Sequence, residues 1–207
     1  MNEHKRRRPE GSNWWDFGPD DQVGRMNLIT PEIRRRAAEE IQTGEVFCLS
    51  LPLDYPGGSS LFPLRKPPRF LHERRGDGHN FNFRLNYYCS CYNDVVSDDA
   101  VLLYMQYSTQ WDALGHVGQM FDVDGDGREE KVYYNGYLGG SNIIGPDDAR
   151  DGFGAKALGI ENLAVTGVQG RGVLVDLEKR YKRERKLVGY DDPMSALDDQ
   201  KAEVRVG

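Results

Sequence analysis

Cysteine is scarce in this chain of 207 residues, which contains only Cys48, Cys89 and Cys91. An odd and sparse set does not supply the disulfide framework of a small secreted domain, and it suits a reducing compartment. Cys89 and Cys91 have no second pair to complete a zinc knuckle. The cysteine content therefore predicts a cytoplasmic protein.

Long apolar runs and an excess of positive charge are also missing. No stretch approaches the roughly 20 apolar residues of a membrane span. The basic segment 1–13 is followed by no apolar region, so it does not predict a secretory signal. The net charge of −6 argues against nucleic-acid binding, because phosphate contacts need a basic surface. We expect a small-molecule substrate as the partner, with neither nucleic acid nor a membrane.

The familiar motifs of nucleotide and serine-hydrolase chemistry are absent as well. The sequence contains no phosphate loop, no GxGxxG string and no GxSxG nucleophile elbow. A nucleotide-dependent activity therefore has no support in the sequence.

The periodicity of the chain predicts a mixed domain of helices and strands. Thr30-Pro31-Glu32 is typical of a helix start, and Gly44 of its end. Alternation predicts a strand over 45–53 and buried strands over 101–106 and 173–177. The fold class is therefore α/β or mixed α+β, in one domain over 14–207 behind a disordered tail, 1–13.

Other segments are less regular. The Pro/Gly-rich stretch 54–98 predicts a long loop with a strand near 79–89, and the aromatic stretch 14–29 predicts a cover over a core. A short helix is expected near 154–164, and another after Asp192-Pro193.

Two short strands, 117–121 and 131–134, are predicted to form a hairpin around an acidic loop. Within that loop, Asp122, Asp124 and Asp126 followed by Gly127 match the first half of a calcium loop. The twelfth position is Tyr133 instead of glutamate. A calcium-binding loop and a plain Asp/Gly turn both remain open.

The stretch STQWDALGH, residues 108–116, concentrates polar side chains. On a helical turn, Asp112 and His116 share a face and could bind one ion or flank one water. In an extended chain, Gln106, Ser108, Gln110 and Asp112 point the same way. The alternative is that Asp112 caps a helix and His116 is an interior histidine.

The segment QYSTQWDALGH, 106–116, resembles the motif His-x-Gly-Thr-His-x-Asp-x-Pro-x-His of the cyclase family of metal-dependent hydrolases, which includes bacterial kynurenine formamidases. The segments FGPDDQVGRMNLITPE (17–32), YNGY (134–137), LGIENLA (158–164) and GRGVLVDL (170–177) are similar to family segments in the same order. The resemblance implies the family's swivelling β/β/α fold. It also implies that this chain is a member truncated at its C-terminus, and that it is a homo-oligomer.

The resemblance also implies roles for individual residues. Asp112 matches the metal-ligating aspartate and His116 the acid/base histidine, while Gln106 and Gln110 stand where the family has metal-binding histidines. The implied cofactor is a divalent metal ion, manganese or zinc, with magnesium as a further option.

The implied reaction is attack of metal-activated water on a carbonyl. The substrate is an amide of the N-formylkynurenine type, as in arylformamidases of tryptophan catabolism, or a lactone or cyclic amide. Trp111 and Tyr134 are expected to stack on it. The rival hypothesis is a catalytically silent relative, or a binding module on the same scaffold, which the two glutamines favour.

Overall fold

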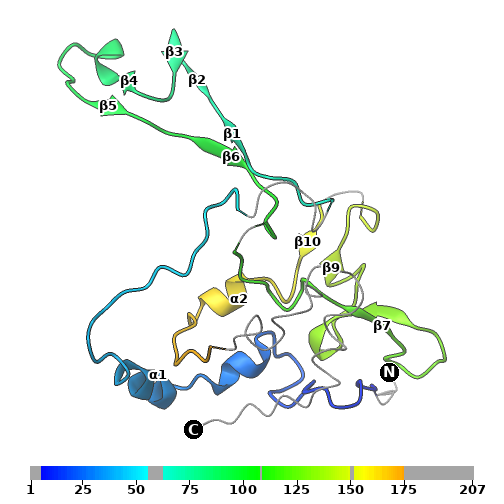
Figure 1. The fold of residues 1–207 in the computed structure, drawn as a ribbon. Helices are drawn as coiled ribbons and strands as arrows, with labels where there is room; N and C mark the ends of the chain where they lie inside the picture. Colours follow the sequence, from blue (N-terminus) through cyan, green and yellow to red (C-terminus); the bar gives the residue numbers. More distant parts are fainter. Residues whose placement is uncertain (1–5, 56–62, 108, 150–151, 175–207) are drawn as a thin grey trace, which may run out of the picture.

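A computed structural model describes residues 6–55, 63–107, 109–149 and 152–174. Every sheet among these residues is a pair of antiparallel strands, as the ribbon in Figure 1 shows. The helices are η1 (Gly24–Leu28), α1 (Pro31–Ala38), η2 (Leu85–Tyr87), η3 (Tyr134–Gly136) and α2 (Glu161–Ala164). The mixed α+β class is thus confirmed. None of the helices among the described residues has the length and apolar character needed to cross a membrane.

Helix α1 begins where its local sequence predicts. The hydroxyl of Thr30 accepts a hydrogen bond from the amide of Ile33 (3.3 Å), and Pro31 takes the first helical position. The helix ends at Ala38, before the predicted Gly44, because the amides of the next three residues bond to carbonyls three residues back and tighten the chain. No residue of α1 is buried, and Ile33 is 41% exposed.

The predicted strand over 45–53 is wrong. The segment is irregular, and Phe47 and Leu49 are 75% and 85% exposed. The strand over 101–106 is only partly correct: β6 (Ala100–Leu102) forms, yet Val101 is exposed. Alternation predicts an extended chain, but a strand needs a neighbour to complete its backbone hydrogen bonds. Residues 173–174 are not in a strand, while 175–177 and the helix after Asp192 lie outside the described residues.

Residues 69–102 form an arm that projects away from the rest of the molecule in Figure 1. At its base β1 (Arg69–Leu71) pairs with β6, and further out lie the pairs β2 (Arg74–Arg75) with β3 (Gly78–His79) and β4 (Phe83–Arg84) with β5 (Val95–Val96). The predicted loop 54–98 therefore contains short paired strands beyond residue 69, and two of them lie near the expected 79–89.

A small cluster stabilises the outer part of the arm. Phe83 is buried and packs edge-on against Tyr87, with ring centroids 5.5 Å apart. The Arg75 guanidinium lies 4.9 Å from the Phe83 ring centroid, within the range of a cation–π contact. Cys89 and Cys91, for which the sequence favoured a reduced state, form a disulfide in the next turn.

The predicted hairpin in the second half of the chain is confirmed. Strand β7 (Gln119–Phe121) pairs antiparallel with β8 (Glu130–Val132) around the acidic loop. The tail expected to be disordered contributes Arg7, whose amide donates to the carbonyl of Val123 (2.8 Å) and whose guanidinium pairs with Asp122 (2.7 Å). Arg7, within the tail expected to be disordered, is thus held against this hairpin.

An apolar cluster among the described residues includes side chains of the hairpin itself. It consists of the buried Trp14, Val123 and Val132, with Trp15, Phe121, Tyr134 and Leu138 packed around them. The tryptophans come from the aromatic segment that the sequence predicted as a cover, and this prediction is confirmed. Strands β9 (Ile143–Ile144) and β10 (Gly154–Ala155) complete the described elements.

Candidate functional site

Asp112 and His116 line the same cavity, of about 380 Å³. The other residues that line it are Trp14, Ala113, Leu114, Val117, Gly118, Gln119, Val132, Tyr133 and Tyr134. The segment forms a hydrogen-bonded turn and no helix, because the amide of His116 donates to the carbonyl of Ala113 (3.0 Å), so the helical arrangement considered from the spacing does not form. The turn nevertheless brings the carboxylate and the imidazole to one hollow.

The turn that carries His116 is held from outside its own sequence. The amide of Gly115 donates to the carbonyl of Leu158 (3.0 Å), and the amide of Leu158 donates to the side-chain oxygen of Gln22 (2.8 Å). Leu158 is fully buried and adopts a positive φ of 62°, which is rare for leucine. A Cβ at Gly115 would come within 3.2 Å of Leu158 and of Ile143, so this close approach favours glycine. Leu158 and Gln22, which are far from the turn in sequence, thus hold the backbone of the turn that carries His116.

The two glutamines of the predicted metal site do not line this cavity. Gln106 lies in a turn beyond the end of β6, and its carbonyl accepts a hydrogen bond from Arg65 (3.2 Å). Gln110 is exposed. The extended run that would aim Gln106 and Gln110 with Asp112 is absent because the strand ends at Leu102. The cavity therefore offers one carboxylate and one imidazole from the predicted set.

The two predicted substrate-binding aromatics differ in position. Trp111 is 60% exposed and is not in the lining, whereas Tyr134 lines the cavity, as does Trp14. The hydroxyl of Tyr134 donates to the carboxylate of Asp21 (2.7 Å). Tyr134 therefore lies at the cavity, and the hydrogen bond of its hydroxyl to Asp21 holds its side chain in place.

The pair of Asp21 and Tyr134 has shifted titrations. Burial raises the pKa of Tyr134, and the hydrogen bond and charge of Asp21 raise it further above the ordinary 10.0. Burial also acts to raise the pKa of Asp21, but hydrogen bonds from Asn27, Tyr134 and the backbone outweigh it, so the pKa lies below the ordinary 3.8. The pair therefore contributes its full stabilisation of the fold between the ordinary pKa values of the two groups, 3.8 and 10.0.

We expect the denaturant midpoint to fall above pH 10, because the raised pKa of Tyr134 gives stability that is complete below its ordinary pKa and lost as the pH rises through the folded one. The midpoint should also fall below about pH 4, as the pH drops through the lowered pKa of Asp21. Urea unfolding of the chain and of Tyr134→Phe across this range checks both. Tyr134→Phe should flatten the alkaline limb, and the exposed Tyr92→Phe should leave it unchanged; an identical limb in all three proteins would contradict the assignment.

An acidic cluster lies at the tip of the β7–β8 hairpin. Asp122, Asp124 and Glu130 each place a carboxylate oxygen within 4.8 Å of the others, a spacing that could hold a metal ion. Asp122 also accepts hydrogen bonds from Arg7 (2.7 Å) and the amide of Gly125 (2.7 Å), so it organises the turn. Glu130 was not among the sequence candidates, because it reaches the loop from β8 and not from the twelfth loop position.

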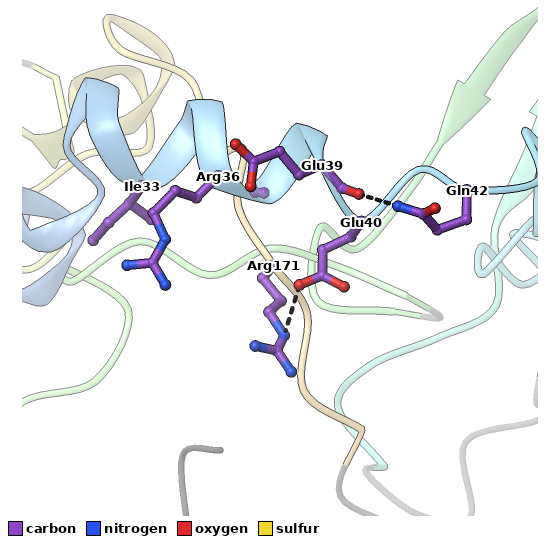
Figure 2. Close-up of a pocket in the computed structure, with 7 residues that line it drawn as sticks. Ile33, Arg36, Glu39, Glu40, Gln42 and Arg171 are labelled. Atoms are coloured by element: carbon purple, nitrogen blue, oxygen red, sulfur yellow. Dashed lines mark hydrogen bonds and ion pairs between the residues drawn. The ribbon is translucent and has the colours of Figure 1, made fainter.

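A second, larger cavity of about 560 Å³ lies at the end of α1 (Figure 2). Its lining is mostly charged or polar, and the Arg171 guanidinium reaches the carboxylate of Glu40 at 3.5 Å. Both side chains are more than half exposed. None of the predicted site residues lines this cavity, so the smaller one is the better candidate for chemistry.

The chain is similar to a solved crystal structure described as a novel cyclase. The TM-score is 0.51 and the sequence identity is 34%, over 73% of this chain and 44% of the other. This chain therefore spans less than half the length of that cyclase. No protein-family model matches the sequence, and no curated protein does.

The likeness to a cyclase agrees with the resemblance read from the motif at 106–116, and it supports a cyclase-like fold for the matched part. The kynurenine formamidase assignment within that class stays a prediction. The structure adds residues that the motif did not indicate: Trp14 forms a wall of the cavity, Asp21 holds Tyr134, and Gln22 holds Leu158. Asp21 and Gln22 do lie in the quoted segment 17–32, which was the available signal.

Proposed function

We propose that the chain is a cyclase-like hydrolase that cleaves an amide or lactone bond, with His116 as the acid/base residue. The observation that carries the proposal is that Asp112 and His116 line one cavity, together with aromatic rings, in a chain similar to a cyclase. The rings of Trp14 and Tyr134 favour a flat substrate, such as an N-formylated aromatic amine, because aromatic faces stack on planar groups.

The chemistry follows from the two polar side chains. His116 removes a proton from a water whose oxygen attacks the carbonyl carbon, and it then gives that proton to the leaving nitrogen or oxygen. Asp112 lines the same cavity, and its negative charge is suited to stabilise the positive charge that His116 carries between these steps. Water is consumed, and an amide yields a carboxylic acid and an amine.

A metal ion at this cavity is implied by the cyclase resemblance, and the donor set does not complete such a centre. Catalytic zinc sites have three protein ligands, whereas the cavity offers one carboxylate and one imidazole. Among the residues that the structure describes, the acidic side chains close enough to share an ion are Asp122, Asp124 and Glu130, on the hairpin. The proposal therefore assigns the proton transfers to His116 and no step to a metal.

Turnover on a panel of N-formyl aromatic amides, cyclic amides and lactones tests the proposal. We expect acid release from at least one class, and loss of it in the double variant Asp112→Asn/His116→Gln. Each substrate is assayed without added metal and with manganese, zinc or magnesium, so a requirement for an ion is measured directly.

The rival function is a silent relative or a binding module that uses the same cavity. It predicts no turnover on any substrate, with or without metal, together with saturable binding of the same compounds in calorimetry. The two outcomes exclude one another, since the hydrolase must release acid.

A further inference from the structure

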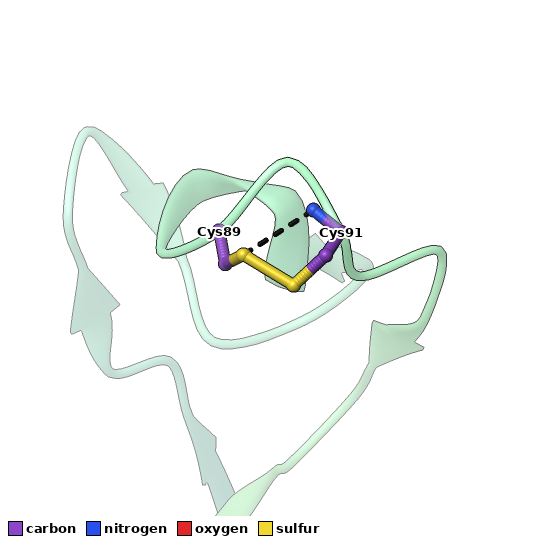
Figure 3. The surroundings of a disulfide bond; sticks show 2 residues. All are labelled: Cys89 and Cys91. Carbon is purple, nitrogen blue, oxygen red and sulfur yellow. Dashed lines mark hydrogen bonds between the residues drawn. A yellow bond between two sulfur atoms is a disulfide. The ribbon is translucent and has the colours of Figure 1, made fainter.

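Cys89 and Cys91 are joined by a disulfide in the turn that follows η2, on the outer part of the arm (Figure 3). Their Cα atoms are 5.2 Å apart, and one residue separates them. Cys48, the remaining cysteine, is free and exposed. We propose that this pair is a thiol–disulfide exchange site that low-molecular-weight thiols of the glutathione class reduce and reoxidise.

The bond contributes little to holding the fold together. A disulfide stabilises a protein mainly by closing a loop in the unfolded chain, and the effect grows with loop length. Here the disulfide closes a very short loop, in which one residue separates the two cysteines. The same turn is also closed by a hydrogen bond from the amide of Tyr92 to the carbonyl of Cys89 (3.0 Å). The two thiols therefore stay close after reduction, ready to reform the bond.

The two sulfurs differ in ways that set the direction of exchange. Cys91 is exposed, while Cys89 is half-buried, so an incoming thiol reaches Cys91 more easily. The Sγ of Cys89 accepts a hydrogen bond from the amide of Cys91 (3.3 Å). A donor at this sulfur stabilises negative charge on it, which makes Cys89 the better leaving thiolate.

Complete reduction of the disulfide consumes two molecules of the small thiol. The thiolate of the first attacks Sγ of Cys91, a new S–S bond forms, the bond to Cys89 breaks, and Cys89 leaves as a thiolate that takes up a proton. The thiolate of the second thiol then attacks the mixed disulfide, releases the oxidised small disulfide and leaves Cys91 as a thiol. The protein gains two electrons and two protons, and the two small thiols lose them; oxidation runs the same steps backwards.

The test uses the full chain with Cys48→Ser, which removes the other reactive thiol. The protein is equilibrated in glutathione buffers from fully reduced to fully oxidised, alkylated with iodoacetamide and weighed by mass spectrometry. We expect the number of alkylated thiols to fall from two to zero across the series. Zero alkylation in every buffer would make the bond a fixed structural link, and two in every buffer would mean that it does not form; either result overturns the proposal.

Single variants test the assigned direction of attack. In the Cys48→Ser background, Cys89→Ser leaves Cys91 to form a mixed disulfide with oxidised glutathione, and Cys91→Ser leaves Cys89. We expect the first to react about tenfold faster, because Cys91 is the exposed sulfur. Equal rates, or faster reaction of Cys89, would contradict the assignment of Cys91 as the attacked atom. Matching far-ultraviolet circular dichroism of the variants controls for loss of fold.

Discussion

Replacing His116 with glutamine is expected to lower kcat/KM of the proposed hydrolase by about 100- to 10,000-fold, the usual contribution of a general acid/base residue. Glutamine keeps a polar side chain of similar length but cannot carry a proton between water and the leaving group. The backbone hydrogen bond of residue 116 to Ala113 does not involve the side chain, so the turn should persist. The measurement is the initial rate on the best substrate of the panel, with denaturant midpoints to verify folding.

A matched control is available on the arm. His79 is exposed, stacks edge-on against His72 (6.5 Å between centroids) and lies outside the cavity, so His79→Gln should leave the rate unchanged. Asp112→Asn and the exposed Asp77→Asn form a second such pair. If His116→Gln retained full activity while folded, the acid/base role would have to move to another residue.

Replacing Asn135 with alanine is expected to lower the free energy of unfolding by about 3–5 kcal/mol, a large part of the stability of an ordinary domain. Asn135 is 2% exposed. Its side-chain oxygen accepts from the amide of Trp15 (2.6 Å), and its NH₂ group donates to carbonyls of the segment 18–21, among them that of Gly18 (3.0 Å). Alanine would remove the side-chain partner of the part-buried Trp15 amide and the hydrogen bonds to the carbonyls of Gly18, Pro19 and Asp21.

Asn135 is also required by its backbone, because its φ of 61° lies in the left-handed region that asparagine and glycine tolerate best. Asn135→Gly removes the side chain but relieves this strain, so it should cost about 1 kcal/mol less than Asn135→Ala. The exposed Asn86→Ala is the control and should change stability by less than about 0.5 kcal/mol. Urea unfolding followed by tryptophan fluorescence measures all three; an Asn135→Ala midpoint equal to that of Asn86→Ala would contradict the network.

The features that the sequence predicts correctly are those set by neighbouring residues. The start of α1 depends on Thr30 and Pro31, and the β7–β8 hairpin on alternation around an Asp/Gly-rich turn. The strand over 45–53 fails because its pattern specifies an extended chain without specifying a partner. The disulfide depends on the arm's turn, which the Cys-Ser-Cys spacing alone did not reveal.

For the candidate site too, local sequence indicates some residues and the tertiary structure decides the others. The sequence alone indicated Asp112 and His116 as a polar pair to consider, because they lie in one short segment that resembles the cyclase motif. Only the tertiary structure decided that Gln106 and Gln110 lie outside their cavity and that Trp14 and Tyr134 lie within it. The physical reason is that the turn is fixed by long-range hydrogen bonds, from Gly115 to Leu158 and from Leu158 to Gln22, which no local pattern encodes.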